Sequence, residues 1–212
     1  MDMKLIIATP SPYARKVRVI LREKNIDFEE IIDVPWNTDT LTLGVNPLGK
    51  IPILLRDGHE PLFDSKVIVQ YLDGYKPKPL FYPNNYTENI SARLVETVSD
   101  GICDSIVLIF LENSRKEILR SKTWIKRQEK KIFEGVQYLS NNLDQKQYFV
   151  GNHFNIADVS GFTCLEYLDL RFPKFKWRDK YKNLVSYWNI HKDRQSFKET
   201  KPYAQIIEPL DD

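Results

Sequence analysis

A change of sequence pattern near residue 76 divides the chain into two parts that must fold differently. Before this point, short β-rich runs alternate with helical patterns, which is typical of βαβ units. After it, the proline-rich stretch 75–79 leads into long helical patterns without a strand signal. We therefore expect an α/β domain over residues 1–76, a linker over 77–86 and an all-helical domain over 87–212.

The first part predicts the element order β-α-β-α-β-β-α, that of a small mixed sheet with helices packed on it. Strands are expected at 4–8, 28–33, 51–55 and 60–63, with a short, irregular helical or loop piece at about 36–45. A helix is expected over 13–24, and another begins at Asp64-Ser65. The basic residues of the first helix are predicted to lie on a solvated face: Arg15, Lys16, Arg18 and Arg22.

The second part predicts helices at about 87–112, 114–142, 156–170 and 181–192. The third of these begins with a capping motif, in which Asn155 is the N-cap and Asp158 faces back from the third helical position. Its residues are apolar nearly all round, so we expect it to be central to the core. This motif is assigned a role in folding and none in chemistry.

Composition excludes several function classes. The formal net charge of +2 creates no overall field that would recruit nucleic acid or an anionic membrane, although it allows small basic patches. The N-terminus lacks the pattern of a signal peptide, and the longest apolar run, 106–111, is too short to span a bilayer. A cytoplasmic location is therefore expected, with two reduced, buried cysteines. The three histidines show no metal-ligand spacing, so no metal is expected.

The turn after the first strand places Ser11 just before a helix. Backbone N–H groups and the helix dipole favour negative charge there, and thioredoxin-like folds activate a cysteine thiolate at such a position. A serine cannot exchange disulfides, but it can donate a hydrogen bond to the thiolate of a ligand and lower that thiol's pKa. Taken alone, Ser11 is explained as well by simple helix capping.

Two further segments offer complementary groups. A cis bond between Ile51 and Pro52 would turn the Ile51 backbone outward, where it could pair with an extended peptide, and Lys50 could meet a carboxylate. Asp64 and Ser65 at a helix start could hold an ammonium and a carboxylate. The simpler alternatives are a trans proline and a plain N-cap. Together the three segments fit the groups that a γ-glutamyl-cysteinyl-glycine peptide offers: a thiol, an extended backbone, and charged ends that carry an ammonium and carboxylates.

These segments resemble the glutathione transferase family, in order and at fitting spacing over the whole first domain. The stretch 11–18 resembles the serine-type active-site segment of its tau and related bacterial branches, and 46–52 resembles its cis-proline loop. Asp64-Ser65 resembles the glutamyl-binding helix start, usually Glu-Ser. The resemblance implies a thioredoxin-like domain followed by a helical bundle, with glutathione as co-substrate and no metal.

By the same resemblance, Ser11 would polarise the glutathione sulfur and Ile51, before the cis Pro52, would pair with the cysteinyl backbone. Lys50 would meet the glycyl carboxylate, while Asp64 and Ser65 would hold the γ-glutamyl end. The family usually forms homodimers, which we expect here, with no nucleic acid or membrane partner. An electrophile pocket is expected among Tyr13, Trp36, Asp100, Cys103, Asp104 and Val107.

Three functions fit this scaffold. The leading hypothesis is a detoxifying glutathione S-transferase acting on a small hydrophobic electrophile, with glutathione-dependent peroxidase or isomerase activity left open. The alternative is a non-enzymatic interaction protein of the stringent-starvation type that binds RNA polymerase, because fold does not fix function. A glutaredoxin-like reductase is disfavoured because such enzymes need a cysteine where this chain has Ser11.

Overall fold

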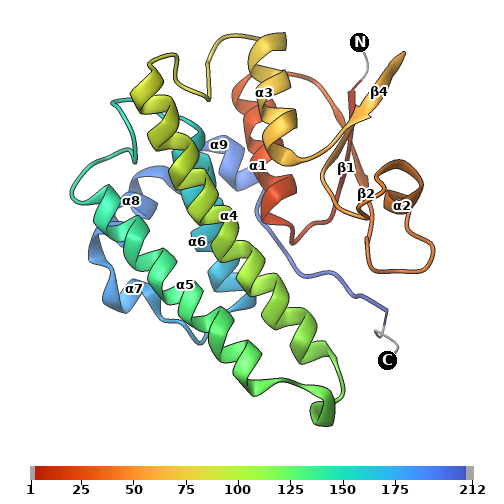
Figure 1. Ribbon diagram of the computed structural model, residues 1–212. Helices are drawn as coiled ribbons and strands as arrows, with labels where there is room; N and C mark the ends of the chain where they lie inside the picture. Colours follow the sequence, from red (N-terminus) through yellow and green to blue (C-terminus); the bar gives the residue numbers. More distant parts are fainter. Residues whose placement is uncertain (1–2, 209–212) are drawn as a thin grey trace. The chain divides into compact units, whose positions relative to one another are not determined.

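The computed structural model describes residues 3–208 and divides into two compact units (Figure 1). Unit 1 combines the stretch that ends at Tyr82 with Arg194–Glu208, and unit 2 is Pro83–Asp193. The predicted helical domain, 87–212, thus differs from unit 2 near its C-terminal end, because Arg194–Glu208 belong to unit 1.

Unit 1 contains a four-stranded mixed sheet of the order β2-β1-β3-β4. Strand β1 pairs parallel with β2 and antiparallel with β3, which in turn pairs antiparallel with β4. The predicted thioredoxin-like order is confirmed, with strand boundaries within about two residues, whereas the piece predicted over 36–45 is helical only at Thr42–Val45. The elements are β1 (Met3–Ile7), α1 (Pro12–Glu23), β2 (Glu29–Ile32), α2 (Thr42–Val45), β3 (Ile53–Arg56), β4 (His59–Leu62) and α3 (Ser65–Tyr75), with α9 (Gln195–Glu199) added from the C-terminal segment.

The strand register brings the three motif segments to one end of this sheet. Ile6 near the end of β1 pairs with Ile53 at the start of β3. Leu54 of β3 pairs with Leu62 at the end of β4. The turns that follow β1, precede β3 and follow β4 therefore lie at the same end of the sheet.

The basic residues of α1 are not on a solvated face, and that prediction was wrong. Arg15, Lys16 and Arg18 are 1%, 1% and 8% exposed, and α9 packs against α1. Arg15 donates to the Thr200 hydroxyl at 3.3 Å and to the Phe197 carbonyl at 3.2 Å. The Arg15 guanidinium is therefore buried against the C-terminal segment of unit 1 and does not face solvent.

A buried ion pair ties part of the predicted linker to unit 1. The Lys24 ammonium lies 2.9 Å from an Asp73 carboxylate oxygen and also donates to the Lys76 carbonyl at 2.7 Å. Asp73 accepts backbone N–H groups of Phe81 and Tyr82 at 3.0 and 2.8 Å. These hydrogen bonds explain why unit 1 continues to Tyr82.

Unit 2 is helical, as predicted, and α4 packs against both α5 and α6 (Figure 1). The predicted helix over 114–142 begins later, because Ser121 caps α5 through the N–H of Trp124 and residues 115–121 form a connection that holds only the short η1. No helix in residues 3–208 is both long and apolar enough to cross a membrane. The elements are α4 (Tyr86–Ser114), η1 (Glu117–Leu119), α5 (Lys122–Leu143), α6 (Ile156–Arg171), α7 (Trp177–Lys180) and α8 (Lys182–His191).

Helix α6 is buried on nearly all sides and carries the predicted capping box between Asn155 and Asp158. Gly161 on this helix lies against Phe149, since an added Cβ would come within 2.5 Å of that ring. No side chain larger than hydrogen fits there unless the buried ring moves.

We expect Gly161→Ala to lower the free energy of unfolding by about 1–3 kcal/mol, because overpacking outweighs the gain in helix propensity. Urea unfolding followed by circular dichroism measures this. Gly101→Ala on α4 is the matched control, since an added Cβ meets no atom within 4 Å there. It should raise stability by about 0.5–1 kcal/mol. A stabilised Gly161→Ala would contradict the predicted clash.

Candidate functional site

Ser11 lies at the N-cap of α1, at the end of the sheet where β1 finishes. Its Oγ accepts the Ala14 N–H at 3.2 Å, which confirms that it caps the helix. As an acceptor in that bond, the hydroxyl keeps its own proton, and it donates to no group within residues 3–208. Ser11 is half-buried, so the O–H can serve the helix and still donate to an external anion.

The Ile51–Pro52 peptide bond is cis, as expected. Neither the N–H nor the C=O of Ile51 takes part in a hydrogen bond within the described part of the chain. Both groups precede β3 and are therefore able to pair with an added extended peptide. The Lys50 ammonium is exposed and has no ion-pair partner among residues 3–208.

The Asn46 side chain holds the loop that carries Lys50 in place. The sequence predicted a turn here but not this role of the side chain. Its side-chain amide donates to the Lys50 carbonyl at 2.7 Å, and its side-chain oxygen accepts the Leu48 N–H at 3.0 Å. Asn46 is 1% exposed. A buried side chain with both groups satisfied holds the loop in one conformation.

Asp64 caps α3 through the N–H of Lys66 at 2.8 Å, and its carboxylate is exposed. Ser65 is buried beside it, with its hydroxyl 3.4 Å from the Asp64 carboxylate. The first N–H groups of a helix have no partner within it, so this turn presents donors next to a carboxylate. That combination suits a zwitterionic amino-acid end, which carries one charge of each sign.

The residues expected for an electrophile pocket are divided between the two units. Tyr13 follows Ser11 on α1, and Trp36, 39% exposed, lies in the loop after β2. On α4, Asp104 is exposed and Val107 half-buried, whereas Cys103 is 2% exposed. Burial and the neighbouring Cys103 raise the pKa of Tyr167 on α6. The buried Cys103 therefore belongs to the packing between α4 and α6.

A polar network after β2 was not foreseen from the sequence. Asp33 accepts hydrogen bonds from the Thr40 hydroxyl at 2.7 Å and from the Thr42 N–H at 3.0 Å. Burial alone would raise the pKa of Asp33, but the hydrogen bonds from Thr42 and Thr40 hold it below its ordinary value. This network joins the two ends of the loop that contains Trp36.

We expect Asp33→Asn to lower the free energy of unfolding by about 1–3 kcal/mol at neutral pH, because the loop loses charge-assisted hydrogen bonds. A lowered folded-state pKa stabilises the fold above the unfolded pKa of about 3.9, and that stabilisation is lost as the pH falls through the folded value. The difference between wild type and variant should therefore shrink in acid. Denaturant titration at several pH values measures it.

The matched control for that experiment is Asp39→Asn. Asp39 is exposed in the same loop and makes no hydrogen bond within residues 3–208. It should change stability by less than about 0.5 kcal/mol at every pH. An Asp33→Asn deficit that stays constant into acid would contradict the proposed role of the ionised carboxylate.

The C-terminal segment after α9 also holds the turn that precedes Ser11. Thr9, 3% exposed, donates from its hydroxyl to the Tyr203 carbonyl at 3.0 Å and from its N–H to the Gln205 side chain at 3.1 Å. Gln205 also donates to the Asp33 carbonyl at 3.4 Å. The segment thus joins the ends of β1 and β2 within unit 1, although it lies almost 200 residues away in sequence.

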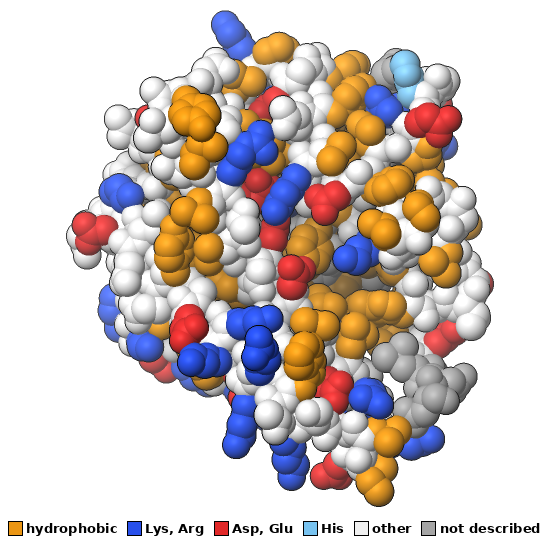
Figure 2. All heavy atoms as spheres, viewed as in Figure 1, with side chains coloured by type: hydrophobic (Ala, Val, Ile, Leu, Met, Phe, Trp, Pro, Cys, Tyr) orange, Lys and Arg blue, Asp and Glu red, His pale blue; other side chains and the backbone are white. Residues whose placement is uncertain are grey.

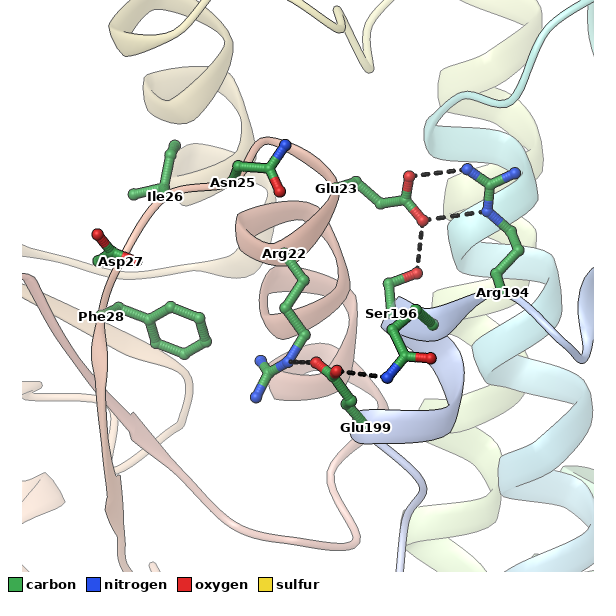
Figure 3. A pocket seen from close by; sticks show the side chains of 10 residues that line it. Arg22, Glu23, Asn25, Ile26, Asp27, Phe28, Arg194, Ser196 and Glu199 are labelled. Carbon is green, nitrogen blue, oxygen red and sulfur yellow. Dashed lines mark hydrogen bonds and ion pairs between the residues drawn. The ribbon is translucent and has the colours of Figure 1, made fainter.

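A cavity of about 660 Å³ lies at the other end of α1 (Figure 3). It is separated from Ser11 by the length of the helix, about 18 Å. Most of the charged groups that line it pair with one another: Glu23 binds Arg194 and also Ser196, and Arg22 binds Glu199. We therefore assign it to the packing of α9 on α1 and not to the candidate site. Within residues 3–208, no three His, Cys, Asp or Glu side chains are grouped so that they could hold a metal ion.

Comparison with known proteins agrees with this geometry. The profile of the glutathione S-transferase N-terminal domain matches residues 10–74, and that of the C-terminal domain matches 122–187. The chain is 30% identical over 200 residues to the uncharacterized GST-like protein YibF of Escherichia coli (strain K12), covering 94% of this chain and 98% of that one.

Two solved structures are similar over nearly their full length. A glutathione S-transferase from Methylobacterium radiotolerans in complex with glutathione sulfonate has a TM-score of 0.95 and 39% identity, with 98% of both chains covered. Another, from Methylobacillus flagellatus with GSH bound, has a TM-score of 0.91 and 36% identity, covering 95% of this chain and 100% of that one. The resemblance drawn from the sequence motifs is confirmed: this chain belongs to the glutathione S-transferase family.

Proposed function

We propose that this protein is a glutathione transferase in which the Ser11 hydroxyl stabilises the thiolate of bound glutathione. The proposal rests on the hydrogen bonding of the Ser11 hydroxyl. Its oxygen accepts the bond that caps α1, and its O–H donates to no group in residues 3–208. A charge-assisted hydrogen bond and the N-terminus of α1 both favour the ionised sulfur. The glutathione-type ligands of the two similar structures support the choice of co-substrate.

The other contacts with the tripeptide are proposed for residues at the same end of the sheet as Ser11. Its cysteinyl backbone would pair with the N–H and C=O of Ile51, which no group in residues 3–208 occupies. Lys50 would meet the glycyl carboxylate, and the turn of Asp64 and Ser65 would take the γ-glutamyl end. The peptide would then lie as an added strand across the ends of β1, β3 and β4.

The acceptor is proposed to be a small hydrophobic electrophile. Tyr13 and Trp36 are the contacts that we propose from unit 1, since both follow strand ends at the site and Trp36 is exposed. For Asp104 and Val107 of α4, contact with the electrophile stays a prediction. The cytoplasmic location and the peroxidase or isomerase activity also stay predictions. Catalysis would rest on ionising the thiol and holding it near its acceptor.

Retention on glutathione-agarose, followed by a conjugation assay with an aryl halide, tests the function. We expect retention that soluble glutathione reverses, and turnover that rises with pH as the bound thiol ionises. Retention without turnover on a panel of electrophiles would favour the non-enzymatic alternative. A protein that neither binds glutathione nor turns over would refute the proposal.

We also propose that the protein forms a homodimer. Tyr86, Ile90 and Leu94 on α4 form an exposed apolar stripe at i, i+4 and i+8, with exposed fractions of 80%, 50% and 49%. Single exposed apolar residues are common, but a continuous stripe favours a partner surface. Light scattering should give twice the chain mass of 25.0 kDa, and Ile90→Lys should convert it to the monomer mass. A wild-type monomer at micromolar concentration would contradict the proposal.

A further inference from the structure

The connection between α4 and α5, together with the first turns of α5, concentrates positive charge. Residues 115–131, here called the basic tip, contain eight Lys and Arg residues and two Glu residues, a net charge of +6. The whole chain has 31 basic and 29 acidic residues, which leaves 23 and 27, or −4, for the rest. The nearly neutral total therefore conceals a strongly asymmetric charge distribution.

Most of this charge is not neutralised within the protein. Lys122, Lys126, Arg127 and Lys131 are exposed and have no ion-pair partner among residues 3–208. Within the basic tip, Arg115 pairs with Glu112 at 3.6 Å and Lys130 pairs with Glu134 at 3.7 Å. The second of these pairs lies between exposed side chains and contributes little. Figure 2 shows Lys and Arg side chains gathered at the lower left of the face in view, where Figure 1 draws α5.

The basic tip also carries apolar side chains that face solvent. Every residue from 113 to 124 is exposed, in contrast to the buried face of α5 that begins at Gln128. Ile118 is 91% exposed, Leu119 42% and Trp124 40%. The basic tip therefore presents two aliphatic residues and one tryptophan among its basic residues.

We propose that the basic tip binds the surface of an anionic lipid bilayer, as a peripheral contact. Lys and Arg are attracted to anionic headgroups, while an aliphatic side chain and a tryptophan insert at the boundary with the acyl chains. The strength of such binding scales with buried apolar area and with attraction to anionic lipids, and the basic tip offers both contributions.

The aliphatic residues favour lipid over other anionic partners. Nucleic-acid sites that lack sequence preference combine basic residues with aromatic platforms on which bases stack. Here the most exposed apolar side chain is Ile118, which has no π-face to offer a base. An acidic protein surface would explain the charge and leave the exposed aliphatic residues without a role.

Flotation of the full chain with vesicles tests the proposal. At about 0.1 M salt we expect binding to vesicles of phosphatidylcholine mixed with phosphatidylglycerol and none to phosphatidylcholine alone. The triple variant Lys122→Gln/Lys126→Gln/Arg127→Gln should bind about a hundredfold more weakly, because each basic residue near an anionic surface contributes comparably. Ile118→Ser should weaken binding about five- to tenfold with the charge unchanged.

The matched control, Lys78→Gln/Lys182→Gln/Lys201→Gln, removes the same charge from exposed positions outside the basic tip. It should bind like wild type, and the melting temperatures of all variants should agree within a few degrees. Absent binding to the anionic vesicles would overturn the proposal, as would equal losses in the control. Unchanged binding by Ile118→Ser, or tighter binding to single-stranded nucleic acid than to the vesicles, would exclude lipid as the partner.

Discussion

Ser11→Ala is expected to lower kcat/KM for glutathione conjugation by about 100-fold, the scale of a lost proton-transfer or thiolate-stabilising group. The Ser11 hydroxyl is the donor that we assign to the glutathione sulfur, and nothing in residues 3–208 accepts its proton. Without it, the pKa of the bound thiol should rise toward the ordinary value of about 8.5. The pH dependence of thiolate absorbance in the binary complex measures this shift directly.

Because Ser11 also caps α1, the substitution should lower stability by about 1 kcal/mol. Ser11→Thr keeps both the cap and the hydroxyl, so it is the matched control and should retain most activity. Ser11→Cys should gain some disulfide-reducing activity at the expense of conjugation, since a thiolate is favoured at a helix N-terminus. If Ser11→Ala kept the thiol pKa of wild type, the sulfur would lie elsewhere.

The parts of the fold and of the candidate site that could be predicted from sequence are those encoded by local signals. A serine before a helix, the turn 46–49 and the capping box at Asn155 each act over a few residues, and each was found where expected. The strands were also predictable, because short apolar runs between turn residues have few alternatives. The order of the strands then brought the segments to one end of the sheet.

The parts that could not be predicted depend on contacts between residues distant in sequence. Arg15 and Arg18 are buried by α9 and by the residues that follow it, and nothing near position 15 signals a segment at position 200. Burial alone would raise the pKa of Glu30, but Arg18 and Arg22 hold it below its ordinary value, which requires β2 beside α1. Tyr203 and Gln205 support Thr9 from equally far away.

Asp158→Ala is expected to lower the free energy of unfolding by about 3–5 kcal/mol, the largest loss of stability that we predict. The Asp158 carboxylate is fully buried and accepts the backbone N–H groups of Phe149 at 2.9 Å and Asn155 at 3.1 Å. Removal of the carboxylate leaves two buried donors without an acceptor, at about 1–3 kcal/mol each, and opens a cavity at the start of α6. Urea unfolding followed by tryptophan fluorescence measures the loss.

Two companion variants separate the causes of that loss. Asp158→Asn keeps the volume and one acceptor but turns an amide group toward an N–H donor, so its cost should be intermediate if hydrogen bonding dominates. Asp179→Ala removes an exposed carboxylate on α7 and should change stability by less than about 0.5 kcal/mol. Because domains of this size are stable by only about 5–15 kcal/mol, Asp158→Ala should also populate partly unfolded chains near physiological temperature. A change below 1 kcal/mol would mean that the α6 start is held by packing alone, with the capping box dispensable.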